Sequence, residues 1–192
     1  GNIINAAVPF LLLPFLTNYL STVDYGIIAI FQVILNFTNP VSGISVNGAV
    51  TRQYYFLKDS PNEFGKFVSN ALFIVTIATS FVLIIYYFFG DTISKYTDFP
   101  SEWLWVVLVC SFSHNIIEVA LSIWRVKLHA TYYVLFRFLR TLLEMGISIL
   151  LILYVDESWE SRVEGQLYIS VLFALLALFF MWKMNVFRFR FQ

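Results

Sequence analysis

The sequence predicts an all-α integral membrane protein with six transmembrane helices, and three observations lead to this fold class. First, 59% of the 192 residues are hydrophobic and only 12% are charged, whereas about 25% of the residues of a soluble domain are charged. Second, the apolar residues gather in stretches of about 20, the length that spans a bilayer as a helix. Third, basic and acidic residues outside these stretches segregate onto alternate connections. The net charge of zero offers no basic surface for nucleic acid.

Six apolar stretches mark the expected helices in chain order. They are residues 3–20, 25–50, 64–89, 103–126, 131–154 and 165–184. The second stretch contains Pro40, which lacks a backbone donor, so we expect a kink or a loosened turn near it. The connections 21–24, 58–63 and 98–101 carry turn and cap residues, as helix boundaries do. An up-and-down arrangement of helices follows.

The positions of Lys and Arg near the ends of these stretches predict the orientation in the membrane. Eight basic residues fall on one side: Arg52, Lys58, Lys66, Arg125, Lys127, Lys183, Arg188 and Arg190. The opposite connections hold only Lys95 and Arg162 together with most of the acidic residues. We therefore expect both ends of the chain to lie on the cytoplasmic side.

Three charged residues interrupt the fifth stretch and predict a functional site. Arg137, Arg140 and Glu144 follow at i, i+3 and i+7, so they share one face of a helix. Each such charge costs about 2.5–3.5 kcal/mol at the centre of a membrane helix on insertion scales, so the three need partners, water or a functional role. Arg137 is shallow enough to reach the cytoplasmic interface. We expect Arg140 to lie deeper, with Glu118 and Glu144 as its counter-charges.

The fourth stretch carries a second polar face. Its members recur at three- and four-residue steps: Ser111, His114, Asn115, Glu118, Ser122 and Arg125. A short turn joins the fourth and fifth stretches, so both polar faces can line one cavity. The alternative is a structural network in which Arg140 and Glu144 bridge at i+4 and Glu118 ties two helices together. His114 is either a hydrogen-bonded packing residue or a proton relay to Glu118.

The second stretch is unusually polar for a membrane helix. Asn36 and Asn39 are candidates for the same cavity. The small residues that follow are typical of close helix packing: Ser42, Gly43, Ser45, Gly48 and Ala49. The sequence contains no phosphate-binding loop, no metal-ligand pattern and no Gly-x-Ser-x-Gly element, so we expect no enzyme activity, cofactor or metal site. The single cysteine, Cys110, excludes an internal disulfide,.

Three segments resemble the polysaccharide (O-antigen and capsule) flippases of the multidrug, oligosaccharidyl-lipid and polysaccharide exporter superfamily. Residues 11–29 resemble the opening of these proteins and read Leu-Leu-Leu-Pro-Phe-Leu-Thr-Asn-Tyr-Leu-Ser-Thr-Val-Asp-Tyr-Gly-Ile-Ile-Ala. Residues 47–55 resemble a second patch, a Gly followed by an Arg and aromatics, and residues 161–165 resemble a Gly-Arg-x-x-Gly element. Asn18 stands where many relatives have a basic residue, and Ser161 replaces the usual glycine. The order of these segments and the six-helix plan cover nearly the whole chain.

The resemblance implies that residues 1–192 are a fragment, the N-terminal six-helix bundle of an exporter with 12 to 14 helices. The second bundle of the same chain would lie outside this sequence. Such a transporter flips a polyprenyl-diphosphate-linked oligosaccharide from the cytoplasmic to the outer leaflet by alternating access, for surface polysaccharide biosynthesis. Its place is a bacterial or archaeal cytoplasmic (inner) membrane, where a polysaccharide polymerase and assembly proteins are further partners.

The resemblance also implies roles for the polar residues. Substrate binding would fall to Arg140, Arg137, Arg52, Asn36 and Asn39, and charge pairing or ion coupling to Glu118, Glu144 and His114. An arginine offers a diphosphate two parallel donors, which suits the lipid head group.

Four other functions compete with this interpretation. A cation-coupled multidrug exporter of the same superfamily would favour acidic and aromatic cavity residues over a pair of arginines, and a lipid II flippase is hard to separate by sequence. A membrane-embedded glycan transferase would need a carboxylate or histidine cluster at the cytoplasmic interface, where only Asp59 and Glu63 are acidic. A purely structural assembly subunit would not explain charges near the midplane.

Overall fold

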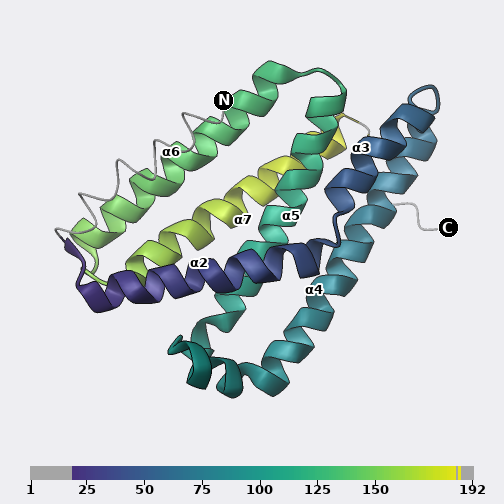
Figure 1. Cartoon of the computed structure of the whole chain (residues 1–192). Coiled ribbons are helices and arrows are strands. Elements are labelled where there is room, and N and C mark those ends of the chain that lie inside the picture. Colours follow the sequence, from purple (N-terminus) through teal and green to yellow (C-terminus); the bar gives the residue numbers. More distant parts are fainter. Residues whose placement is uncertain (1–18, 185, 187–192) are drawn as a thin grey trace.

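A computed structural model describes residues 19–184 and 186 of the chain, and the regular structure in this part is entirely helical. The elements are α2 (Thr22–Gly43), α3 (Val46–Leu57), α4 (Pro61–Thr97), the short 3-10 helix η1 (Ser101–Trp103), α5 (Leu104–Val126), α6 (Ala130–Tyr154) and α7 (Trp159–Lys183) (Figure 1). The expected all-α class is therefore confirmed for this part. Of the first expected stretch, 3–20, all but the last two residues lie outside the described residues.

Four helical stretches in the described part are long and apolar enough to cross a membrane. They are Thr22–Leu57, Pro61–Thr97, Ser101–Val126 and Trp159–Lys183. Helix α6 is also long, at 25 residues. It is not among these four helical stretches because Arg137, Arg140 and Glu144 interrupt its apolar sequence. Large apolar side chains such as Phe81 and Phe88 of α4 are exposed, as expected of surfaces that face lipid. These features mark the chain as a membrane protein.

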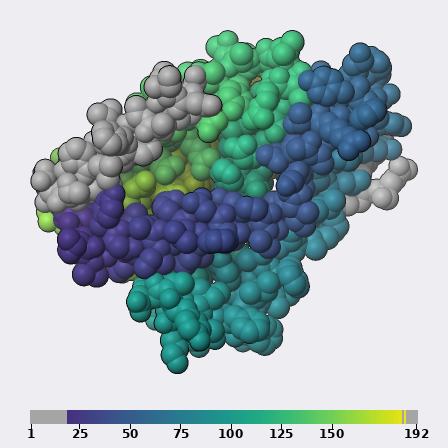
Figure 2. All heavy atoms as spheres, viewed as in Figure 1, coloured from purple at the N-terminus to yellow at the C-terminus, as the bar shows by residue number. Residues whose placement is uncertain are grey.

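Helix α5 is the central element of the assembly. It packs against α2, α3, α4, α6 and α7, and the side chains of Ile117, Val119 and Ala120 are fully buried. Helix α7 packs against both α5 and α6. It lies between α2 and α6 in the ribbon view and is seen between them in the space-filling view (Figures 1 and 2). The polar faces of α5, α6 and α7 are thereby brought together in one region.

The single helix expected over residues 25–50 is instead two helices. Helix α2 ends at Gly43, and Ile44 (φ 43°) and Ser45 (φ 52°) both adopt left-handed backbone conformations before α3 begins. Such a conformation costs a non-glycine residue about 1–2 kcal/mol, so tertiary contacts must hold the break open. Pro40 remains inside α2, and its carbonyl oxygen accepts a hydrogen bond from the Ile44 N–H at 3.0 Å. The loosened turn therefore lies one turn after the proline.

Helices α6 and α7 approach each other most closely at Gly165. A Cβ atom on this residue would lie 2.6 Å from the Oγ and 2.9 Å from the Cα of Ser148. No side chain fits such a gap without displacing backbone, so the glycine lets the two helices touch. This contact positions Arg162, one turn earlier on α7, beside α6.

Candidate functional site

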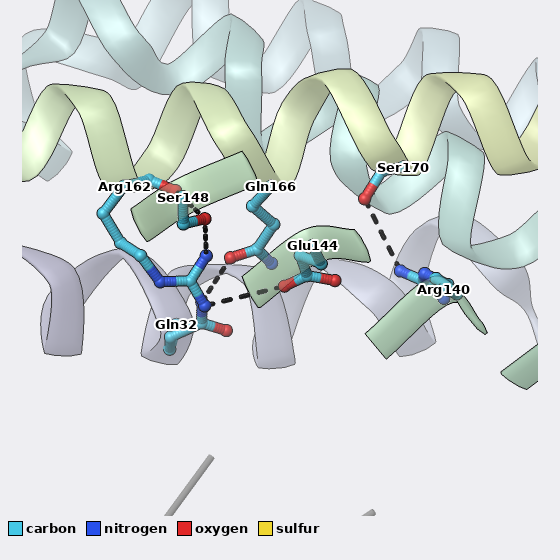
Figure 3. Close-up of polar contacts among 7 residues, drawn as sticks. All are labelled: Gln32, Arg140, Glu144, Ser148, Arg162, Gln166 and Ser170. Atoms are coloured by element: carbon cyan, nitrogen blue, oxygen red, sulfur yellow. Dashed lines mark hydrogen bonds and ion pairs between the residues drawn. The ribbon is translucent and has the colours of Figure 1, made fainter. Parts of the chain in front are cut away.

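The strongest polar link of the described region joins α6 to α7 (Figure 3). The Nη2 atom of Arg162 lies 3.6 Å from the Oε1 atom of Glu144, and its Nη1 atom donates a hydrogen bond to the Oγ of Ser148 at 2.9 Å. Both charged side chains are largely buried, at 13% and 18% exposure. Sequence reasoning placed Arg162 in an outer connection and missed this role. The nearby Gly165 was the available signal, because a glycine permits close helix contact.

A second polar link joins α2 to α7 beside the first (Figure 3). The Nε2 atom of Gln32 donates a hydrogen bond to the Oε1 of Gln166 at 2.7 Å, and Gln166 is buried. Buried amides are stable in a membrane when they bond to each other across helices. Together the two links tie α2 and α6 to α7.

Arg140 is left without a carboxylate partner. Its Nη2 atom lies 3.5 Å from the Oγ of Ser170 on α7 (Figure 3), and its Nε atom is buried with no hydrogen-bond partner among residues 19–184 and 186. Within the described residues no ion pair joins it to Glu144 or Glu118, so the expected counter-charges are wrong. Glu144 instead pairs with Arg162 from the neighbouring helix. The guanidinium of Arg140 is therefore not neutralised by Glu144.

Arg137 is held by a phenol rather than by a carboxylate. Its Nη1 atom donates a hydrogen bond to the Oη of Tyr133 at 3.0 Å, and the Nη2 atom of Arg125 lies 3.5 Å from the same oxygen. The Arg125 guanidinium also stacks over the Tyr133 ring, 5.4 Å from its centroid, as cations do on aromatic faces. Burial at the adjoining turn lowers the pKa of Lys127,. The positive charge at this end of α5 and α6 therefore comes from the two guanidinium groups of Arg125 and Arg137.

His114 connects the polar faces of α5 and α6. It is half-buried, and the charges of Arg140, Glu118 and Arg137 all act on it. Charged residues of both polar faces therefore lie within electrostatic range of His114. Glu118 is also half-buried and makes no hydrogen bond or ion pair with the described residues.

A cavity of about 190 Å³ lies at the break between α2 and α3. Its lining residues are Asn39, Pro40, Gly43, Ser45, Val46, Asn47, Val75, His114, Asn115 and Glu118. Of the site residues predicted from sequence, the cavity therefore contains Asn39, His114 and Glu118. Asn36 and Arg52 are exposed on α2 and α3 and do not line it. Arg137 and Arg140 are not part of this lining either, so this cavity does not contain all the predicted site residues.

Small residues let α2 and α5 pack closely beside this cavity. The Nδ2 atom of Asn115 donates hydrogen bonds to the Oγ of Ser42 at 2.9 Å and to the carbonyl oxygen of Asn39 at 3.5 Å. The hydroxyls of Ser42 and Ser111 are 2.6 Å apart. A Cβ atom on Gly43 would lie 2.3 Å from the Oδ1 of Asn115. The packing role expected for Ser42 and Gly43 is confirmed.

Comparison with known proteins gives one relative. The chain is 26% identical over 164 residues to protein 1 of the Lsg locus of Haemophilus influenzae. The match covers 85% of this chain and 38% of that protein, so the chain spans well under half of the length of its relative. No protein-family model matches the sequence. No solved structure matches it.

Proposed function

We propose that this protein is a membrane transporter that flips a polyprenyl-diphosphate-linked oligosaccharide from the cytoplasmic to the outer leaflet. It works by alternating access, and its product feeds surface polysaccharide biosynthesis. The described helices belong, on this proposal, to the N-terminal six-helix bundle of a two-bundle exporter. The observation that carries the proposal is the guanidinium of Arg140, which forms no ion pair with the described residues.

The surroundings of Arg140 suit an anionic ligand. The side chain lies on a largely apolar helix, and the nearest carboxylate on that helix pairs with Arg162. The buried Nε donor has no acceptor in the described part of the chain. A charge in this position is stable only with a partner, an aqueous cavity or a ligand. A diphosphate supplies pairs of acceptor oxygens that the planar guanidinium binds with two parallel hydrogen bonds.

Arg137 supplies a second positive charge on the same face of α6. Its only hydrogen-bond acceptor in the described region is the neutral phenol of Tyr133, so its charge is not cancelled. With the start of α6 on the cytoplasmic side, Arg137 and Arg140 lie about 10 and 15 Å along the helix at a rise of 1.5 Å per residue. A lipid head group that enters from the cytoplasmic leaflet meets Arg137 first and Arg140 next.

The proposal is tested by removing the charge of Arg140 and following glycan export. We expect Arg140→Gln to reduce translocation of the lipid-linked oligosaccharide at least tenfold, which is about 1.4 kcal/mol of lost head-group binding. Arg140→Lys keeps the charge but loses the parallel donors, so it retains part of the rate. Lys95→Gln, at the far end of α4, serves as the control that leaves export unchanged. A correctly inserted Arg140→Gln protein with normal export contradicts the proposal.

A further inference from the structure

The chain around the turn between α5 and α6 carries positive charge that no carboxylate neutralises. Residues 119–143 contain Arg125, Lys127, Arg137 and Arg140 and no acidic residue. Within residues 19–184 and 186, none of these four side chains forms an ion pair with a carboxylate. Arg137 and Arg140 belong to the site proposed above. Arg125 is exposed at the end of α5 and is a separate positive group.

Tyr133 holds Arg125 in a fixed orientation. The guanidinium carbon of Arg125 lies 5.4 Å from the centroid of the Tyr133 ring, and such stacking restricts the side chain. The ring is held in turn, because its hydroxyl accepts the hydrogen bond from Arg137 at 3.0 Å. In the described part of the chain, the only acceptor for Arg125 is this same oxygen, at 3.5 Å. Most of the N–H donors of Arg125 are therefore oriented but have no protein acceptor there.

Arg125 and Lys127 lie at the depth of lipid phosphates. The stretch Ser101–Val126 is long and apolar enough to cross a membrane, so residues at its end lie where the hydrocarbon meets the head groups. Lys127, which follows directly, is half-buried. Burial lowers the pKa of its ammonium group, because the charged form loses water without an anionic neighbour to replace it. An anion beside Arg125 would stabilise the charge of Lys127 as well.

The same turn presents an apolar side chain to its surroundings. Leu128 has a φ of 58°, a left-handed conformation that costs a leucine free energy, and its side chain is 87% exposed. The adjacent His129 packs its ring edge-on against Tyr132, which is also exposed. In water, Leu128 would gain nothing from this strained and exposed position. Among lipid head groups the same side chain contacts acyl chains, so the turn fits a lipid surface better than a soluble anion.

We infer that the turn between α5 and α6 binds the head group of an anionic phospholipid of the phosphatidylglycerol type. The phosphate oxygens accept hydrogen bonds from Arg125, Lys127 adds a positive charge, and Leu128 contacts the acyl chains. Basic sites between transmembrane helices bind anionic head groups in this way on the cytoplasmic side of a membrane.

This lipid site is separate from the proposed transport of a lipid-linked oligosaccharide. Its place in the cytoplasmic leaflet rests on the orientation used in the proposed function. Lipid binding itself does not, because the same side chains form the site on either side of the membrane. Since Arg125 and Arg137 share the Tyr133 oxygen, a bound phospholipid would lie beside the point where, on that proposal, the cargo enters.

The test is scintillation proximity binding of tritium-labelled phosphatidylglycerol to the purified protein in detergent, with no lipid-linked oligosaccharide present. We expect unlabelled phosphatidylglycerol to compete at least tenfold better than phosphatidylcholine with the same acyl chains. The double variant Arg125→Gln/Lys127→Gln should bind phosphatidylglycerol at least tenfold more weakly, since each basic residue contributes about fivefold. The double variant Lys58→Gln/Lys183→Gln is the matched control. It removes the same charge from the exposed ends of α3 and α7 and should bind as the wild type does.

Three results overturn the inference. The first is equal competition by the two lipids, and the second is an equal loss of binding in the two double variants. The third is displacement of phosphatidylglycerol by inorganic phosphate but not by chloride at equal ionic strength, which would identify a site for the free ion. If Arg125→Gln/Lys127→Gln does not fold, as judged by gel filtration, Arg125→Gln decides alone, and wild-type affinity in that variant overturns the inference.

The lipid-binding assay and the export assay of Arg140→Gln fail separately. Loss of the lipid site leaves the guanidinium of Arg140 in place, and normal export in Arg140→Gln leaves phosphatidylglycerol binding at Arg125 unchanged.

Discussion

Glu144 of α6 pairs with Arg162 of α7 across 3.6 Å and not with Arg140, which lies one turn away on its own helix. Arg162 is the partner because Gly165 brings α7 against α6 at Ser148, and Ser148 accepts a hydrogen bond from the same guanidinium that pairs with Glu144. One ion pair and one hydrogen bond fix Arg162 in place, whereas an i+4 pair on one helix is worth only about 0.3–0.5 kcal/mol. As a result, Arg140 has no counter-charge among the described residues, and Arg140 is the candidate ligand-binding residue.

A double-mutant cycle should separate the two possible partners of Glu144. We expect Glu144→Gln and Arg162→Gln to be coupled by about 0.5–3 kcal/mol in the free energy of unfolding, because the side chains are in contact. Glu144→Gln and Arg140→Gln should be coupled by less than about 0.5 kcal/mol. Denaturant titration of the detergent-solubilised protein measures both. A stronger coupling to Arg140 would show that the arrangement of α6 against α7 is wrong.

Two glycines on the same pair of helices give a matched test of helix contact. In Gly165→Ala the new Cβ meets the backbone of Ser148, so we expect a loss of about 1–3 kcal/mol of stability from overpacking. In Gly146→Ala the Cβ meets no described residue within 4 Å, and the better helix propensity of alanine should stabilise α6 by about 0.5–1 kcal/mol. Thermal unfolding midpoints should therefore move in opposite directions. A shift of the same sign in both variants counts against close packing at Gly165.

The link between Gln32 and Gln166 predicts a rescue. Gln32→Leu leaves the buried amide of Gln166 without a partner, and interhelical hydrogen bonds in membranes are worth about 0.6 kcal/mol on average and about 1.7 at most. We expect a loss in this range for Gln32→Leu and recovery of most of it in the double variant Gln32→Leu/Gln166→Leu. Unfolding midpoints measured side by side decide this, and additive losses in the double variant argue against the bond.

Tyr133 should support the function of Arg137 without being essential. Tyr133→Phe removes the hydroxyl that accepts from Arg137 but keeps the ring over which Arg125 stacks. One hydrogen bond is worth about 0.5–1.5 kcal/mol, so we expect export to fall by about two- to tenfold, less than in Arg140→Gln. Export rates of both variants at equal expression check the order. A larger loss in Tyr133→Phe contradicts the primary role of Arg140.

The proposed orientation can be read from cysteine labelling. Cys110 is buried, so Cys110→Ser provides a background without a native thiol. We expect Asp59→Cys, in the turn between α3 and α4, to react with a membrane-impermeant maleimide only from the cytoplasmic side. Glu157→Cys, between α6 and α7, should react only from the outside. The reverse pattern would invert the orientation and place Arg137 and Arg140 in the outer half.

The sequence by itself determined the class of protein and where most helices lie. The apolar stretches 103–126 and 131–154 agree closely with α5 and α6, because the length of a membrane helix follows from bilayer thickness. The sequence also showed that Arg140 is a charged residue inside an apolar stretch, where a charge needs a partner, water or a function. Helix α4 extends well past the expected 64–89, because its last turns are not apolar and composition alone does not reveal them.

Only the tertiary structure decided which charges meet. Spacing along one helix favoured Arg140 as the partner of Glu144, but the partner comes from another helix, and no sequence period encodes how close α7 lies. The same is true of the break at Ile44 and Ser45, since two left-handed non-glycine residues are held by packing against their own preference,. A residue type and its spacing define what chemistry is possible, whereas contacts between helices select the partner that is within reach.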